Sequence, residues 1–367
     1  MNLIKRLVVL PFLGGLLVSC STQRKISKEA KADFFSNADF APAHLGISVF
    51  DPSTSKYLYN FQGDKLFIPA SNTKLFSCYA AMKYLGDSIV AARYKVEGNT
   101  VVLQATGDPT FLHPDFRNQR LYNFLNQDWV QDIEINTKFN SEPLGRGWAW
   151  DDYTAEYMAE RDPFPMYGNV ATFIFSGDTL RTIPQSLRQA IVGNPEFNKA
   201  WTVDRNLGGR FFTIVNGRGT NAMQKSITMS MDKGAFAARY LSDTLHKRVA
   251  PTFDPLTVAE SKKFYSQPLD SMLKIMMHRS DNFFAEQTLM MVGSEWLGVM
   301  SDRRVTDSLL NSDLKDLPQK PRWVDGSGLS RYNLFSPQDF IWLLNKMEKE
   351  FGIERMKDIL PTGGEGT

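Results

Sequence analysis

The sequence is poor in the residues that build disulfide frameworks and metal sites. Only two cysteines, Cys20 and Cys78, occur among 367 residues. The four histidines stand singly, and no His, Cys and carboxylate residues have the spacing of a metal site. The sequence therefore predicts no disulfide framework, no metal and no other cofactor. Cys78 lies in an apolar run and is expected to be a buried small hydrophobic residue.

An excess of charge of one sign is also missing. Lys and Arg number 42 against 40 for Asp and Glu, and no long basic stripe is present. This balance disfavours nucleic acid as a partner. The hydrophobic fraction of 43% excludes a disordered chain. The length of 367 residues indicates two domains, or one domain with a large insertion.

The N-terminus has the pattern of a targeting segment. Lys5 and Arg6 precede an apolar run at residues 7–19, which is too short to span a bilayer as a mature helix. The run ends in Leu-Val-Ser-Cys, which resembles the lipobox of bacterial lipoproteins. That resemblance implies a lipid on Cys20 and a periplasmic, membrane-anchored protein. The alternative is an ordinary cleaved signal peptide with an incidental cysteine at position 20.

Local patterns predict two β-hairpins and several helices. Asp51-Pro52 and Gly98-Asn99 each separate two strand-like stretches. An apolar run at residues 75–85, closed by Gly86, predicts a helix. Three more helices are predicted at 269–279, at 283–293 and after Ser336-Pro337. The methionines of the first two should lie in the core.

The region between about residues 90 and 260 has a different texture. It is dense in Asn, Asp, Pro, Gly and Trp, which indicates a mixed α/β domain inserted into the domain that begins before it. The predicted organisation is a signal peptide at 1–20, a polar tether at 21–43, a main domain at 44–92 and 260–367, and an inserted domain at 93–259.

A serine followed by a lysine three residues later suggests a nucleophile with an amine base. The chain has five such pairs, at Ser53–Lys56, Ser71–Lys74, Ser230–Lys233, Ser271–Lys274 and Ser312–Lys315. Only Ser71 follows a strand-like stretch and then opens an apolar helix, which would place both side chains on one face. The positive end of the helix dipole would also lower the pKa of the lysine. The alternative is a capped helix start with an exposed lysine.

A second motif stands far downstream. Ser280-Asp281-Asn282 lies between two predicted buried helices and is the only Ser-x-Asn in the chain. Such a loop can hold a hydroxyl and an amide rigidly toward a cleft. The alternative is a plain N-cap for the helix that begins at Phe283. A related Tyr-x-Asn form, Tyr167-Gly168-Asn169, lies among turn residues of the inserted region and ranks lower.

Together these motifs resemble the penicillin-binding protein and serine β-lactamase superfamily. Within it, four stretches resemble the D-alanyl-D-alanine carboxypeptidase/endopeptidase family, peptidase family S13. These stretches are TGDPTF at 106–111, GWAWDD at 147–152, RSDNFFAEQTL at 279–289 and VDGSGLSRYN at 324–333. The resemblance implies an α/β (α+β) fold, with a transpeptidase-like sheet flanked by helices and an inserted mixed domain.

The resemblance also implies a role for each matched residue. Ser71 would attack the carbonyl between two D-alanines, with Lys74 as the base. The backbone N–H of Ser71 would form one half of the oxyanion hole. Ser280 would relay the proton to the leaving amine, and Asn282 would bind the peptide amide of the substrate. The implied partners are peptidoglycan stem peptides ending in D-Ala-D-Ala, and β-lactams as covalent inhibitors. The loop Asp325-Gly326-Ser327-Gly328 is interpreted as a structural tight turn.

One element of the family pattern is missing. No lysine is followed by Thr-Gly or Ser-Gly, and Lys225-Ser226-Ile227 comes nearest, in the wrong region. The last residues, LPTGGEGT, resemble the stretch that precedes this third motif in the family. We therefore expect a truncated reading frame. The alternative function is a non-catalytic lipoprotein that binds peptidoglycan peptides or β-lactams.

Overall fold

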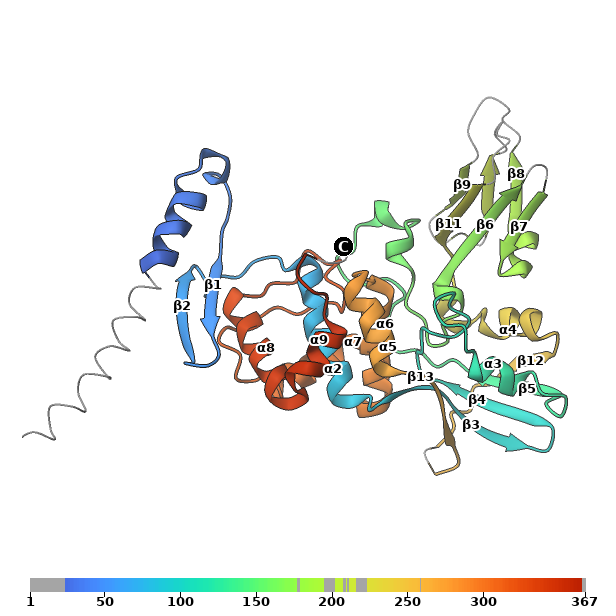
Figure 1. Ribbon diagram of the computed structural model, residues 1–367. Helices are drawn as coiled ribbons and strands as arrows, with labels where there is room; N and C mark the ends of the chain where they lie inside the picture. The colour runs from blue at the N-terminus through green and yellow to red at the C-terminus, as the bar shows by residue number, and fades with distance from the viewer. Residues whose placement is uncertain are drawn as a thin grey trace, which may run out of the picture. The chain divides into compact units, whose positions relative to one another are not determined.

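A computed structural model describes residues 24–176, 179–194, 202–206, 209, 211–215, 223–257 and 259–364. The predicted lipid site at Cys20 lies outside these residues. The chain is mixed α+β, with sheets flanked by helices (Figure 1). It forms two compact units. The first consists of Met1–Ile68, Asp316–Arg322 and Leu334–Glu350, and the second of Pro69–Lys315, Trp323–Asn333 and Phe351–Thr367. In the described part of the chain, no helix has the length and apolar character needed to cross a membrane.

The first unit contains the first predicted hairpin and the last long helix. Strands β1 (Ile47–Asp51) and β2 (Lys56–Phe61) pair antiparallel, which confirms the hairpin. Helix α8 (Pro337–Phe351) begins as predicted after Ser336, whose hydroxyl accepts a hydrogen bond from the N–H of Asp339. Residues 24–30 of the expected tether are helical and continue into η1 (Lys31–Phe35) and η2 (Ala38–Phe40).

A five-stranded sheet organises much of the second unit. Its order is β12-β5-β4-β3-β13. The strands are β3 (Ser88–Glu97), β4 (Thr100–Ala105), β5 (Asp132–Asn136), β12 (Arg248–Pro251) and β13 (Lys262–Pro268). β3 and β4 form the second predicted hairpin around Gly98, whose φ is +60°. Helices α3 (Arg120–Leu125) and α4 (Ala237–Leu245) pack against this sheet (Figure 1).

Two small sheets of the second unit share the hydrophobic core of the five-stranded sheet. One has the order β11-β6-β7 and the other β8-β10-β9. Their strands are β6 (Val170–Ser176), β7 (Thr179–Ile183), β8 (Ile191–Asn194), β9 (Thr202–Arg205), β10 (Phe212–Val215) and β11 (Met223–Thr228). Phe173 on β6 and Phe212 on β10 connect the two sheets, with their ring centroids 5.1 Å apart. Residues 93–259 thus supply most of this sheet structure, and we retain them as the proposed inserted domain.

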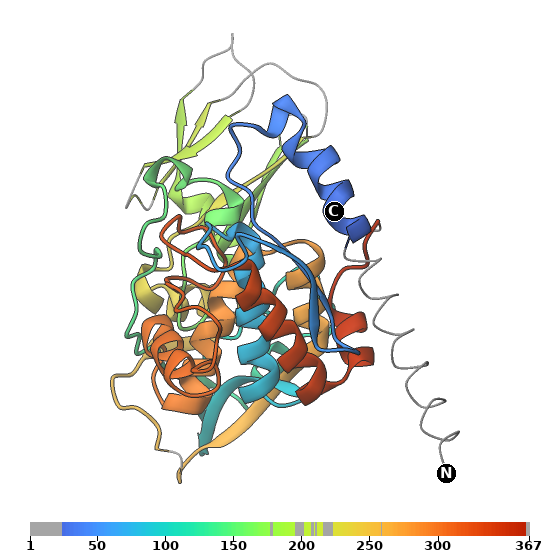
Figure 2. The same ribbon diagram turned by 90° about the vertical axis from the view of Figure 1, so that its left-hand side faces the viewer.

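Helices form the other part of the second unit. They are α2 (Lys74–Tyr84), α5 (Leu269–His278), α6 (Asn282–Val292), η9 (Gly293–Leu297), α7 (Asp302–Asn311) and α9 (Ile353–Ile359). Figures 1 and 2 both show light-blue α2 beside the orange α5 and α6, and α6 packs directly on α2. Every residue of α6 from Phe283 to Val292 is buried, as expected for a central helix. Met276, Met290 and Met291 are buried, which confirms their assignment to the core, whereas Met277 is only half-buried.

Short helical turns complete the second unit. They are η3 (Ala70–Thr73), η4 (Trp150–Asp152), η5 (Glu156–Met158), η6 (Tyr167–Asn169), η7 (Gln185–Ala190) and η8 (Asp232–Gly234). Cys78 is fully buried on α2, as predicted.

Candidate active site

Ser71 lies in a tight turn in front of α2. Ala70 has a left-handed φ of +46° and is the first residue of the 3₁₀ turn η3. The hydroxyl of Thr73 donates to the carbonyl of Ala70 and closes this turn. The helical segment thus opens around Ser71 as predicted, but its first turn is 3₁₀ rather than α, and α2 itself begins at Lys74. Ser71 is exposed while Lys74 is buried, so the turn presents the hydroxyl above a buried amine.

The amine of Lys74 has three hydrogen-bond partners. Its Nζ lies 3.1 Å from Ser71 Oγ, 2.7 Å from Asn282 Oδ1 and 2.9 Å from the carbonyl oxygen of Ser327. The side chain is only 1% exposed, so the alternative of an exposed lysine is wrong. Burial lowers the pKa of Lys74 to about 8, although the negative charges of Glu286, Asp281 and Asp325 act in the opposite direction.

The other serine–lysine pairs have different partners. Ser53 binds Asp51 in the hairpin turn, Ser230 binds Glu160, Lys274 forms an ion pair with Asp358 and Ser312 binds the carbonyl of Ser308. Among the described residues, Ser71 and Lys74 are the pair of this spacing that is joined by a hydrogen bond. This hydrogen bond distinguishes the pair from the other four, and its catalytic role stays a prediction.

The three residues of the Ser280-Asp281-Asn282 motif make different contacts. Asp281 caps α6 by accepting the N–H of Phe284 at 2.9 Å, as expected from the capping alternative. Asn282 donates from Nδ2 to the carbonyl of Tyr157 at 2.9 Å, which turns its Oδ1 toward Lys74. Ser280 is half-buried and has a left-handed φ of +54°. Its hydroxyl is not hydrogen-bonded to Ser71 or Lys74, so the structure joins Asn282, but not Ser280, directly to the pair.

Residues 324–333 fold around a buried carboxylate. Asp325 accepts hydrogen bonds from Gly328 N at 2.9 Å, Ser330 N at 2.6 Å, Asn333 Nδ2 at 2.6 Å and Trp148 Nε1 at 2.9 Å. This network holds the loop as a tight turn, as interpreted from the sequence. The same loop also contacts the site, because Ser327 offers its carbonyl to Lys74.

The four stretches 106–111, 147–152, 279–289 and 324–333 are linked by hydrogen bonds within the second unit. Gln287 donates to the carbonyl of Gly107 at 2.9 Å, and so joins 279–289 to 106–111. Trp148 joins 147–152 to 324–333 through Asp325. Ser327 donates its N–H to Glu286 at 2.8 Å and joins 324–333 to 279–289. The stretches are therefore the parts that assemble around α6.

Residues 32–367 match the D-Ala-D-Ala carboxypeptidase 3 (S13) family. The chain belongs to this family. It is 23% identical to the D-alanyl-D-alanine carboxypeptidase DacB of Haemophilus influenzae over an alignment of 370 residues. This alignment covers 88% of this chain and 74% of that protein. The match confirms the family predicted from the four stretches.

Solved structures show the same fold. Penicillin-binding protein 4 (dacB) of Haemophilus influenzae aligns with a TM-score of 0.69 at 20% identity, over 88% of this chain and 79% of that one. The same protein in complex with a β-lactam gives a TM-score of 0.62 at 18% identity, over 88% and 78% of the two chains. The S13 chain therefore has the fold of penicillin-binding protein 4.

Glu286 is a residue of the candidate site that the sequence did not predict. It lies on α6, fully buried, one turn after Asn282, and Arg161 Nη1 lies 3.4 Å from its Oε2. Burial, with a smaller contribution from the charge of Asp325, raises the pKa of Glu286 to about 8, although the charge of Arg161 acts in the opposite direction. Its sequence signal is a carboxylate within a largely apolar helix, because such a residue is rarely buried without partners.

Proposed function

We propose that this chain is a serine-type D-Ala-D-Ala carboxypeptidase that hydrolyses peptidoglycan stem peptides through an acyl-enzyme on Ser71. The main support is the environment of the Lys74 amine. Asn282 Oδ1 and the carbonyl of Ser327 can only accept hydrogen bonds. In the neutral amine they take the two N–H groups, so the lone pair is left for the O–H of Ser71. The lowered pKa of Lys74 favours this neutral form.

The proposed reaction follows from this arrangement. Ser71 Oγ attacks the carbonyl carbon of the penultimate D-alanine while its proton moves to Lys74 Nζ. The peptide C–N bond then breaks, and the departing D-alanine amine takes the proton of Lys74 Nζ through the hydroxyl of Ser280, which returns Lys74 to its neutral form. Asn282 binds the peptide amide, for which it has one N–H beyond the one given to Tyr157. Water hydrolyses the ester and restores Ser71. The N–H of Ser71 stabilises the oxyanion in both halves.

The remaining parts of the proposal concern targets and location. Cross-linked stem peptides, as an endopeptidase would cleave, and β-lactams, which would acylate Ser71, are the proposed further reactants. The solved relative that was crystallised with a β-lactam supports the second of these. The segment 1–20 is proposed as a lipoprotein signal that leaves Cys20 lipid-bearing at the membrane surface of the periplasm.

Covalent labelling tests the acyl-enzyme directly. The chain is incubated with a fluorescent penicillin, denatured and separated by electrophoresis. Labelling is expected in the wild type, loss of the label in Ser71→Ala, and full labelling in Ser271→Ala, a serine with the same spacing to a lysine on α5. Release of D-alanine from a stem pentapeptide should show the same pattern. A wild type that binds penicillin reversibly but is never labelled would contradict the enzyme and support the binding lipoprotein.

A further inference from the structure

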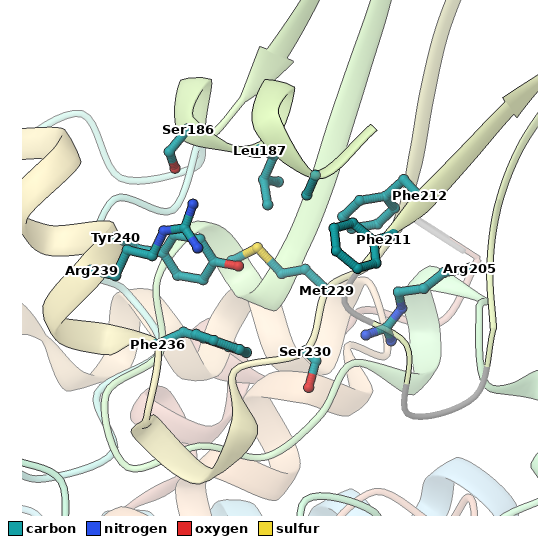
Figure 3. Close-up of a pocket in the computed structure, with 11 residues that line it drawn as sticks. Ser186, Leu187, Arg205, Phe211, Phe212, Met229, Ser230, Phe236, Arg239 and Tyr240 are labelled. Atoms are coloured by element: carbon teal, nitrogen blue, oxygen red, sulfur yellow. The ribbon is translucent and has the colours of Figure 1, made fainter. Parts of the chain in front are cut away.

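A pocket far along the chain from Ser71 lies at one end of the small sheets. Its volume is about 170 Å³. Its walls come from η7, β9, β10, residues 229–230 and α4 (Figure 3). It is lined by Ser186, Leu187, Ala190, Arg205, Phe211, Phe212, Met229, Ser230, Phe236, Arg239 and Tyr240. All of these residues belong to the second unit.

Arg205 is a buried cation with incomplete hydrogen bonding. The residue is 3% exposed, and its Nη2 donates to Thr228 Oγ1 at 3.0 Å. Its guanidinium also stacks on the ring of Tyr153, with 4.5 Å between the carbon and the ring centroid. Its Nε and Nη1 are buried and have no hydrogen-bond partner in the part of the chain that the structure describes. Figure 3 shows this guanidinium directed from β9 toward Met229 and Ser230.

The neighbouring carboxylate of Glu160 does not satisfy these donors. Glu160 Oε1 lies 3.7 Å from Nη2 of Arg205, on the side already used by Thr228. Glu160 also accepts hydrogen bonds from the hydroxyls of Tyr153 and Ser230 and from the N–H of Met231. Its charge is therefore shared among several donors. Buried N–H groups of a guanidinium without an acceptor are costly, so an anionic acceptor at Nε and Nη1 would be strongly favoured.

The rest of the pocket is apolar with a few polar points. Four of its lining residues are buried, namely Leu187, Phe212, Met229 and Tyr240. Phe211 is 61% exposed. Ser186 Oγ is a third buried polar atom of this pocket without a hydrogen-bond partner among the described residues. The volume of about 170 Å³ is slightly larger than that of an apolar cavity known to admit benzene, about 150 Å³. The pocket thus combines a cation with space for one ring or short aliphatic group.

We propose that this pocket binds a small carboxylate that carries one apolar group. The carboxylate would accept from Nε and Nη1 of Arg205, and the apolar group would lie among Phe211, Phe212 and Tyr240. The exposed Arg239 adds a second positive charge at the rim. This binding site is separate from Ser71, and its existence does not depend on the activity proposed above.

The test compares an anion with its neutral analogue of the same shape. The full chain is titrated with benzoate and with benzamide at constant ionic strength, and binding is followed by ligand-observed NMR. Saturable benzoate binding is expected, with benzamide at least tenfold weaker. Arg205→Gln should weaken benzoate binding at least tenfold. Arg181→Gln, an exposed arginine on β7 outside the pocket, should leave it unchanged and so controls for net charge.

A second variant covers the case in which Arg205→Gln does not fold. Ala190→Phe would fill the pocket and leave the Thr228 and Tyr153 contacts of Arg205 in place. Benzoate binding should be lost in this variant, while its urea unfolding transition should stay cooperative, as in the wild type. Equal binding of benzoate and benzamide, no saturable binding of benzoate, or undiminished binding in Ala190→Phe would each overturn the proposal.

Discussion

At the scale of single residues, the proposed reaction depends on the protonation of Lys74. Its amine is almost entirely removed from solvent, and burial lowers its pKa to about 8. Two of its three neighbours are oxygen atoms that can only accept, so protonation changes which group contacts Ser71. A lysine that loses its proton near neutral pH can act as a general base, whereas an exposed lysine remains charged.

The rate of acylation by penicillin should therefore rise with pH. Below the pKa of about 8 the neutral fraction of Lys74 increases about tenfold per pH unit, and above it the rate should level off. The measurement is the second-order labelling rate between pH 6 and 10. Lys74→Arg is the control, because a guanidinium does not lose its proton in this range. A wild-type rate that is already constant from pH 6 upward would contradict the role of Lys74 as base.

Glu286 should make the stability of the chain depend on pH in the opposite sense. Its folded-state pKa of about 8 lies above the ordinary value of 4.5, so the unfolded state loses the proton first. The stability that this group contributes is complete below pH 4.5 and is lost as the pH rises toward 8. Urea unfolding at pH 5 and pH 8 should show a smaller loss in Glu286→Gln than in the wild type. An equal loss in both proteins would assign the pH dependence to other groups.

The left-handed backbone at Ser280 allows its hydroxyl to be tested separately from its fold. A non-glycine residue at a φ of +54° costs on the order of 1 kcal/mol, which glycine avoids. Ser280→Gly should therefore unfold at equal or higher urea concentration than Ser280→Ala. If the hydroxyl relays the proton, both variants should release D-alanine at least tenfold more slowly than the wild type. Unchanged turnover in both would remove Ser280 from the mechanism.

At the scale of elements, the turn η3 is held in place by the loop at 324–333. A Cβ added at Gly328 would lie 1.9 Å from the carbonyl oxygen of Ala70 and 3.0 Å from Thr73 Oγ1. The loop backbone thus lies directly against the turn that presents Ser71. Because Ser327 of the same loop accepts from Lys74, one loop supports both the hydroxyl and the amine.

Gly328→Ala should therefore damage the site more than an ordinary glycine substitution. Gly86 is a matched control, since its φ of +71° is also left-handed but nothing lies within 4 Å of an added Cβ. Gly86→Ala should cost about 1 kcal/mol of backbone strain, and Gly328→Ala should cost at least 1–3 kcal/mol more from the overlap. Urea unfolding measures the stability, and penicillin labelling should fall only in Gly328→Ala. Equal costs for the two variants would show that the loop yields easily.

At the scale of the whole molecule, the sequence predicted elements better than contacts. The hairpins around residues 51 and 98, and the helix opened by Ser336, follow from local turn and capping chemistry, which needs no knowledge of the fold. The Ser71–Lys74 pair was found because spacing along a helix is also local. Ser327 and Tyr157 could not be found, because they act through backbone carbonyls that every residue has.

The three contacts of Lys74 have a consequence for how the chain folds. Two of its partners are 208 and 253 residues away in sequence, so the amine acquires its environment only after segments from distant parts of the chain have docked. Contacts of such separation form late and slowly compared with local helices. During refolding, capacity for covalent penicillin capture should therefore appear after helical circular dichroism has returned. A β-lactam would then serve as a probe of the last steps of folding.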